Sequence, residues 1–180
     1  MRLAAAIAIL GVFSICSSPC GAARAQETPS AADAAKLDQA RLIVNGDVEK
    51  PLSLSLKDLS ALPRQILKVT NEHDKKVQTY QGVPLAELLK RAGVPQGGAL
   101  QGPALAMFVR AEGADGYAVI FGLAELDSSV QDSGVLVADT LDGEPLTGNL
   151  GPLRLIVPHD KRPARWVRML RSITVVKPSK

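Results

Sequence analysis

The stretch that decides the fold reads GPLRLIVPHDKRPARWVR, from Gly151 to Arg168. Its first half is apolar except for Arg154, and its second half is a cationic loop that carries the only tryptophan, Trp166. An apolar strand rarely holds a charge without a partner for it. The stretch therefore predicts a strand with Arg154 as a candidate anion ligand, followed by a loop that Trp166 anchors to the core. The alternative is an edge-strand arginine whose charged head lies in water.

The N-terminus has the pattern of a secretory signal. Met1-Arg2 supplies a charged start, an apolar run of 13 residues extends from Leu3 to Ile15, and Ala23-Arg24-Ala25 forms a small-x-small cleavage site. Because a transmembrane helix needs about 20 apolar residues, we expect no membrane anchor in the mature chain. We predict a signal peptide at residues 1–25, a flexible lead at 26–40 and one domain at 41–180, in the periplasm.

Composition excludes several classes of site. Both cysteines, Cys16 and Cys20, lie inside the predicted signal, so the mature chain has no disulfide, thiolate metal ligand or cysteine nucleophile. Removing Arg2 and Arg24 from the 21 basic residues leaves 19 against 18 acidic ones. This near-neutral balance gives no indication of nucleic-acid binding.

Residues 41–180 show many short strand patterns. Leu52, Leu54 and Leu56 alternate with serines, which is typical of a half-buried strand. Similar criteria predict eight further strands, at residues 42–46, 66–70, 76–80, 104–110, 117–121, 135–138, 153–157 and 173–176. A polar turn is expected at 71–74, and Asp142-Gly143 predicts a hairpin turn.

One segment has a clear helical pattern. Pro84 suits the start of a helix, the leucines at 85, 88 and 89 share one face, and Gly93 ends it. Shorter helical turns are expected at 57–62 and 123–126. A strand-rich chain with one good helix is typical of an α+β domain built on antiparallel or mixed sheets.

The order of these motifs resembles the molybdopterin-binding domain of the sulfite oxidase family. The matching segments are VNGDVEKP (44–51), LKDLSALP (56–63), QGVPL (81–85), DGY (115–117), LDGEPL (141–146) and GPLRLIVP (151–158). The resemblance covers about residues 41–177 and implies a strand-rich α+β fold of mixed sheets with few short helices. It also implies a phosphate-bearing pterin whose dithiolene chelates molybdenum, with one protein cysteine as a further ligand.

The resemblance places the pterin site on five positions of this chain. Arg154 matches the arginine of the family's Pro-x-Arg-Leu strand, Arg165 and Arg168 match two cations spaced three apart, and Asn149 matches an asparagine before the strand. Thr70 stands near the position of the metal-binding cysteine. Guanidinium groups suit a phosphate because they are always charged and donate bidentately. The alternative is that the loop cations are ordinary solvated side chains.

Two features depart from the family. No cysteine stands near Thr70, and an oxygen from Thr70 or Glu72 is a much poorer molybdenum ligand than a thiolate. The signal also lacks a twin arginine, which implies export of an unfolded chain without cofactor. We therefore expect no bound cofactor, with molybdopterin as the alternative.

Three functional interpretations stay open. The first is a secreted oxidoreductase-like domain that binds a small anion, a pterin-like ligand or a partner protein through Arg154 and its neighbours, without the standard molybdenum centre. The second is a molybdenum-cofactor-dependent oxidoreductase that uses an oxygen ligand and passes electrons to a redox partner. The third is an envelope scaffold that binds no small ligand.

Overall fold

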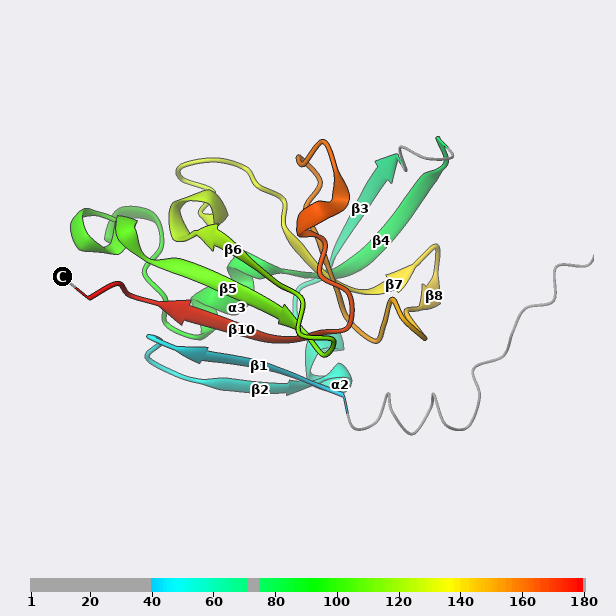
Figure 1. The fold of residues 1–180 in the computed structure, drawn as a ribbon, viewed down its shortest axis with the longest axis horizontal. Helices are drawn as coiled ribbons and strands as arrows, with labels where there is room; N and C mark the ends of the chain where they lie inside the picture. The colour runs from blue at the N-terminus through cyan, green and yellow to red at the C-terminus, as the bar shows by residue number, and fades with distance from the viewer. Residues whose placement is uncertain (1–39, 71–74, 180) are drawn as a thin grey trace, which may run out of the picture.

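Two sheets form the framework of the described residues, and a loop after β9 passes from the second sheet to the first (Figure 1). The structure, a computed structural model, describes residues 40–70 and 75–179, which form ten strands, two α-helices and four 3₁₀ turns. The predicted signal peptide, the lead up to residue 39 and the predicted turn at 71–74 lie outside the described residues. The expected strand-rich α+β class with mixed sheets is confirmed.

The first sheet has the strand order β2-β1-β10-β5-β6. Its members are β1 (Arg41–Gly46), β2 (Leu52–Ser55), β5 (Phe108–Gly113), β6 (Ala118–Gly122) and β10 (Leu170–Val176). β1 and β10 run parallel, and the other neighbours are antiparallel. Alternate residues are buried, such as Leu42 and Val44 on β1, so that one face covers the core and the other meets solvent.

The second sheet has the order β3-β4-β7-β8, and β9 also pairs with β7. Its members are β3 (Gln65–Thr70), β4 (Val77–Pro84), β7 (Leu136–Leu141), β8 (Glu144–Pro145) and β9 (Arg154–Ile156). β3 lies at the edge of this sheet and pairs only with β4. The register places Leu67 of β3 opposite Tyr80, and Arg154 of β9 opposite Ala138.

The core consists of two apolar clusters. The larger lies under the first sheet and includes three leucines of helix α3 (Leu85–Arg91), the segment with the helical pattern. The smaller surrounds Tyr80 on the second sheet. Trp166 packs against both clusters, as expected of an anchor for the loop. Helix α2 (Leu56–Ser60) begins at a capping box, in which Ser55 and Asp58 satisfy each other's backbone N–H groups.

One predicted strand is wrong in its first half. Residues 104–110 were expected to be extended, but Gly102–Ala106 forms the 3₁₀ turn η2 and β5 begins only at Phe108. Gly102 has a φ of 57°, and Pro103 stands in the first turn, a position that suits its fixed φ. Backbone geometry at this Gly-Pro pair therefore outweighs the apolar run that follows it.

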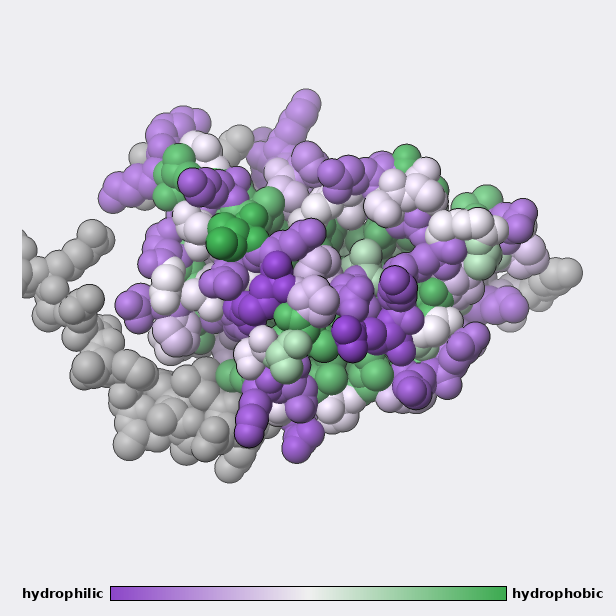
Figure 2. Space-filling model, turned by 180° about the vertical axis from the view of Figure 1, so that it is seen from behind, coloured by the Kyte–Doolittle hydropathy of each residue, from purple (hydrophilic) through white to green (hydrophobic). Residues whose placement is uncertain are grey.

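Exposed apolar side chains are scattered. The most exposed large ones are Ile66 on β3 and Val77 on β4, at 66% and 61%. On the face shown in Figure 2, apolar patches are small and polar side chains separate them. No helix in the described ranges is both long enough and apolar enough to cross a bilayer.

Close packing of β4 on β7 requires a glycine at position 82. A Cβ atom there would lie 2.0 Å from the Val137 carbonyl oxygen, so the two strands would have to separate. We expect Gly82→Ala to lower the free energy of unfolding by about 3 kcal/mol in urea titrations. Gly98→Ala is the control, because a Cβ at Gly98 meets no atom within 4 Å. Equal stability of the two variants would contradict this packing.

Candidate functional site

Arg154 points away from the larger cluster because of strand geometry. Its neighbours Leu153 and Leu155 are buried in that cluster, and successive side chains of a strand point to opposite faces. The Arg154 side chain is thereby directed towards Tyr80 and Trp166, at the margin of the smaller cluster.

The guanidinium of Arg154 lies among aromatic rings. Its Nη1 donates to the Tyr80 hydroxyl oxygen at 3.2 Å, and its Cζ lies 5.3 Å from the centroid of the Trp166 ring. Tyr80 and Trp166 meet edge to face at 5.8 Å. These contacts fix the plane of the guanidinium and leave one edge without a protein partner.

That free edge carries a buried donor. The Nε atom of Arg154 is buried and has no hydrogen-bond partner, and within the described ranges no carboxylate pairs with this side chain. Burial lowers the pKa of the Arg154 guanidinium; the Tyr80 hydroxyl opposes this shift, and the positive charge of Arg168 adds to it. A half-buried cation with an unused donor is a suitable binding group for an anion.

A cavity of about 660 Å³ opens beside Arg154. Its walls come from the end of β3, from Gln78 on β4, from Leu150 and from the loop 158–166. Lys68, Arg154 and Lys161 bring positive charge to the lining, whereas its acidic residue, Asp160, is engaged by Arg165. The volume lies in the range of pockets for organic ligands, and the lining favours one with negative charge.

Of the five predicted site residues, the structure brings two into this cavity. Arg154 and Thr70 both line it, Thr70 from the last position of β3. Asn149 is exposed and precedes Leu150, which lines the wall. Arg168 is exposed at 48% and lies 3.9 Å from the Asp115 carboxylate, so it reaches Arg154 only through its charge.

Arg165 lies on the other side of the loop. Its Nε and Nη2 donate to the two carboxylate oxygens of Asp160 at 2.8 and 2.6 Å, its Nη1 donates to Glu125 at 3.1 Å, and its Cζ lies 4.7 Å from the Phe121 ring centroid. The hydrogen bond to Asp160 raises the pKa of Arg165 further. Arg165 lines a separate cavity of about 160 Å³. Its hydrogen bonds to Asp160 and Glu125 hold the loop in place.

Two cavity residues, Lys68 and Gln78, had no signal in the sequence, whereas Lys161 belongs to the predicted cationic loop. Lys68, Gln78 and Lys161 come from a strand edge, its neighbour and a loop, and only tertiary packing brings them together. Tyr80 is fully buried, and its hydroxyl accepts from Arg154 and donates to Gln78, both at 3.2 Å. Trp166 lines the cavity while its indole N–H donates to the Val157 carbonyl oxygen at 2.9 Å.

The donor set fits an anion better than a thiolate-ligated metal. No cysteine occurs after Cys20, and the described part of the chain has no cluster of three or more His, Cys, Asp or Glu side chains that could hold a metal ion. Glu72, the other candidate oxygen ligand, lies outside the described residues. The orphaned Nε of Arg154 suits the phosphate of a pterin, whereas the sulfur ligand of the metal has no counterpart.

Comparisons with known proteins agree with this geometry. The family model of the oxidoreductase molybdopterin binding domain matches residues 27–180. Among solved structures, the chain is similar to the sulfane dehydrogenase SoxCD from Paracoccus pantotrophus, with 26% identity and a TM-score of 0.61. The similarity covers 79% of this chain but only 39% of the SoxCD chain, so this protein spans well under half of that relative. No curated protein matches the chain.

The contacts of Arg165 predict a positioning role for this residue. Arg165→Ala removes the bidentate bond to Asp160, and we expect a loss of about 1 to 2 kcal/mol in the free energy of unfolding. The loop then loosens, and the fluorescence of Trp166, the only tryptophan, shifts towards that of an exposed indole. Arg162→Ala is the control, because Arg162 is exposed in the same loop. Identical spectra and stabilities for the two variants would refute the role.

Proposed function

The chain belongs to the oxidoreductase molybdopterin binding domain family, and from that premise we propose that it is an exported domain that holds a phosphate-bearing, pterin-like anion against Arg154 without a thiolate-ligated molybdenum centre. The buried, unpartnered Nε of Arg154 beside a 660 Å³ cavity is the observation that carries this proposal.

An anion at Arg154 would balance a local electrostatic cost. A buried charge without a partner is unfavourable, and an oxyanion beside Nε would supply both the counter-charge and the acceptor that this atom lacks. Arg64 shows the contrast, since it donates bidentately to Asp139 at 2.8 and 2.6 Å and its charge is fully matched within the protein. Arg154, in contrast, has no carboxylate partner among the described residues and an unpartnered Nε, which supports a role in binding.

The rest of the lining supports an organic ligand. Trp166 and Leu150 offer apolar surface to a flat ring, while Lys68 and Lys161 can neutralise further negative charge. Such a lining favours a ligand that joins a heterocycle to a phosphate over a bare inorganic ion. The predicted signal peptide at residues 1–25 supports a place in the periplasm.

A molybdenum-dependent oxidoreductase is the second candidate. Family membership and the position of Thr70 in the cavity favour it, because the Thr70 hydroxyl could approach a bound metal. The cofactor, when bound, would supply the redox chemistry, and this chain would hold and orient it. The missing cysteine weighs against this candidate. An envelope scaffold is the third candidate, and it gives the cavity beside Arg154 no function.

The first prediction from this proposal concerns Arg154→Met. Because methionine has a similar length and no charge, we expect the free energy of unfolding to stay the same or rise. Binding of a pterin monophosphate, followed by Trp166 fluorescence and calorimetry, should weaken about ten- to hundred-fold. Arg91→Met is the control, because Arg91 lies on α3 and pairs with Glu87. Unchanged affinity in Arg154→Met would show that Arg154 does not hold the ligand, and absence of binding in the unmodified protein would favour the scaffold.

The second prediction concerns metal content. Protein purified from the periplasm should contain far less than one molybdenum atom per chain by elemental analysis, because no thiolate is present to complete the coordination. Native mass spectrometry of the same sample should show an organic adduct that Arg154→Met loses. Stoichiometric molybdenum, lost in Thr70→Val but kept in Thr79→Val, would instead establish the oxygen-ligated oxidoreductase.

A further inference from the structure

Among the described residues, no strand pairs with the outer edge of β3. The strand pairs with β4 along all six of its residues, and in residues 40–70 and 75–179 no backbone hydrogen bond reaches its other side. Four of its residues are exposed, among them Ile66 at 66%. An open strand edge is a template for an added strand.

This edge is also a wall of the cavity. Three consecutive residues of β3, Lys68 to Thr70, line it. Since successive side chains of a strand point to opposite faces, three lining residues in a row indicate that the cavity reaches the edge of β3 as well as the face that Val69 shares with Gln78 of β4. A chain paired with β3 would therefore run along the opening that leads to Arg154.

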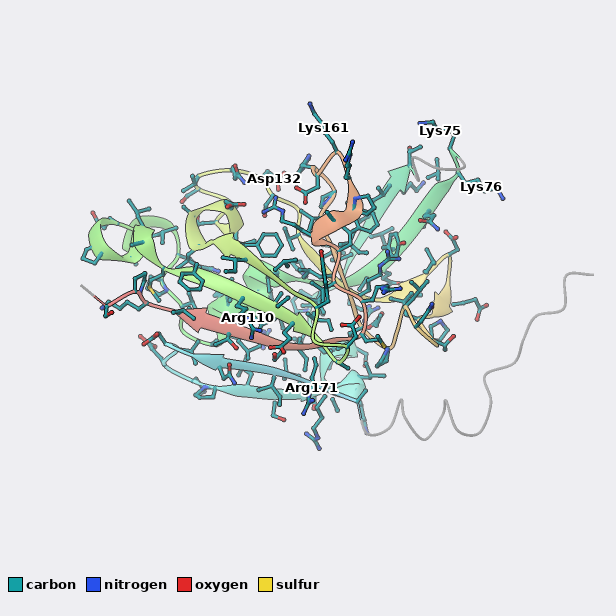
Figure 3. The ribbon with its side chains drawn as sticks, viewed as in Figure 1. Lys75, Lys76, Arg110, Asp132, Lys161 and Arg171 are labelled. Carbon is teal, nitrogen blue, oxygen red and sulfur yellow. The ribbon has the colours of Figure 1, made fainter. Side chains whose placement is uncertain are left out.

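The surroundings of this edge are cationic. Lys161 projects from the loop on one side, and Lys75 lies at the end of the β3–β4 hairpin on the other, at the same end of the molecule (Figure 3). Lys68 lies on the strand between them, and Arg162 is exposed in the loop. Within the described ranges, no ion pair to a carboxylate involves these side chains. The partner that this surface favours therefore carries acidic side chains.

We propose that β3 is a docking strand, on which an extended acidic segment of a partner protein adds to the free edge and places a carboxylate against Arg154. The inference rests on the proposed function, because it uses the same anion-binding group, and it names a peptide as a second class of guest. Backbone hydrogen bonds to β3 would supply affinity, and a side chain on the cavity side would supply selectivity through Arg154.

The probe is a blocked octapeptide of alternating valine and glutamate, and the same peptide with glutamine is its control. Binding is followed with the purified chain by Trp166 fluorescence and by amide hydrogen exchange resolved by NMR. We expect the glutamate peptide to bind at least about ten-fold more tightly than the glutamine peptide. It should also slow exchange of alternate β3 amides, those that point away from β4.

Two kinds of variant separate the parts of the site. Arg154→Met should reduce the preference for glutamate over glutamine to near unity. Ile66→Pro and Leu67→Pro are compared because adjacent residues of an edge strand direct their N–H groups to opposite sides. The variant that retains the native melting temperature should lose peptide binding. Amide exchange in the unmodified chain gives the same information if both proline variants unfold.

The outcomes discriminate between the two proposals. If pterin monophosphate binds but the glutamate peptide leaves the β3 amides unchanged, the docking strand is overturned and the proposed function stays intact. Protection of β3 that is equal for both peptides, or equal in Arg154→Met, also overturns it, because Arg154 then takes no part. Binding to anionic phosphatidylglycerol vesicles with unchanged β3 amides would assign the cations to a membrane surface instead. If neither pterin monophosphate nor the glutamate peptide binds, the proposed function is overturned as well.

Discussion

The cost of burying a charge governs the architecture around Arg154. Strand β9 is held in the second sheet by β7, and the alternation of its side chains leaves the guanidinium between Tyr80 and Trp166 rather than in water. The two rings shield the cation from water and attract it through cation–π interactions. They offer no hydrogen-bond acceptor to the Nε atom of Arg154. The strand, the two aromatic residues and the cavity therefore form one unit, in which the Nε atom of Arg154 has no hydrogen-bond partner among the described residues.

The loop after β9 keeps this unit in shape. Tyr117 donates from its hydroxyl to the Ala164 carbonyl oxygen at 2.5 Å, and Arg165 ties the same loop to Asp160 and Glu125. Arg165 and Glu125 line the smaller cavity, while Trp166 lines the larger one beside Arg154. The two cations thus make different contacts: Arg165 ties the loop to Asp160 and Glu125, whereas Arg168 is exposed and contributes positive charge near Arg154.

Anion binding and metal binding make different demands on a pocket. An anion needs desolvated donors and positive charge, which Arg154, Lys68 and Lys161 provide on the cavity wall. The molybdenum centre that the family resemblance implies needs in addition a cysteine thiolate, and residues 21–180 contain no cysteine. The same wall can serve a peptide carboxylate as well as a phosphate, since both present oxyanions to a guanidinium.

Sequence by itself determined the class of fold and two residues of the candidate site, Arg154 and Thr70. Period-2 patterns, the capping of short helices and the order of turns are local properties, so most strands and the helix at 85–91 were predictable. The arginine inside an apolar strand identified Arg154 for the same reason. Only tertiary structure decided which residues meet it, because Lys68, Gln78 and Trp166 are brought together by the pairing of β3 with β4 and by the path of the loop. The tertiary structure also places Arg165 apart from Arg154, on the other side of the loop. The spacing of residues along the chain does not determine on which side of a loop a side chain such as Arg165 pairs with a carboxylate.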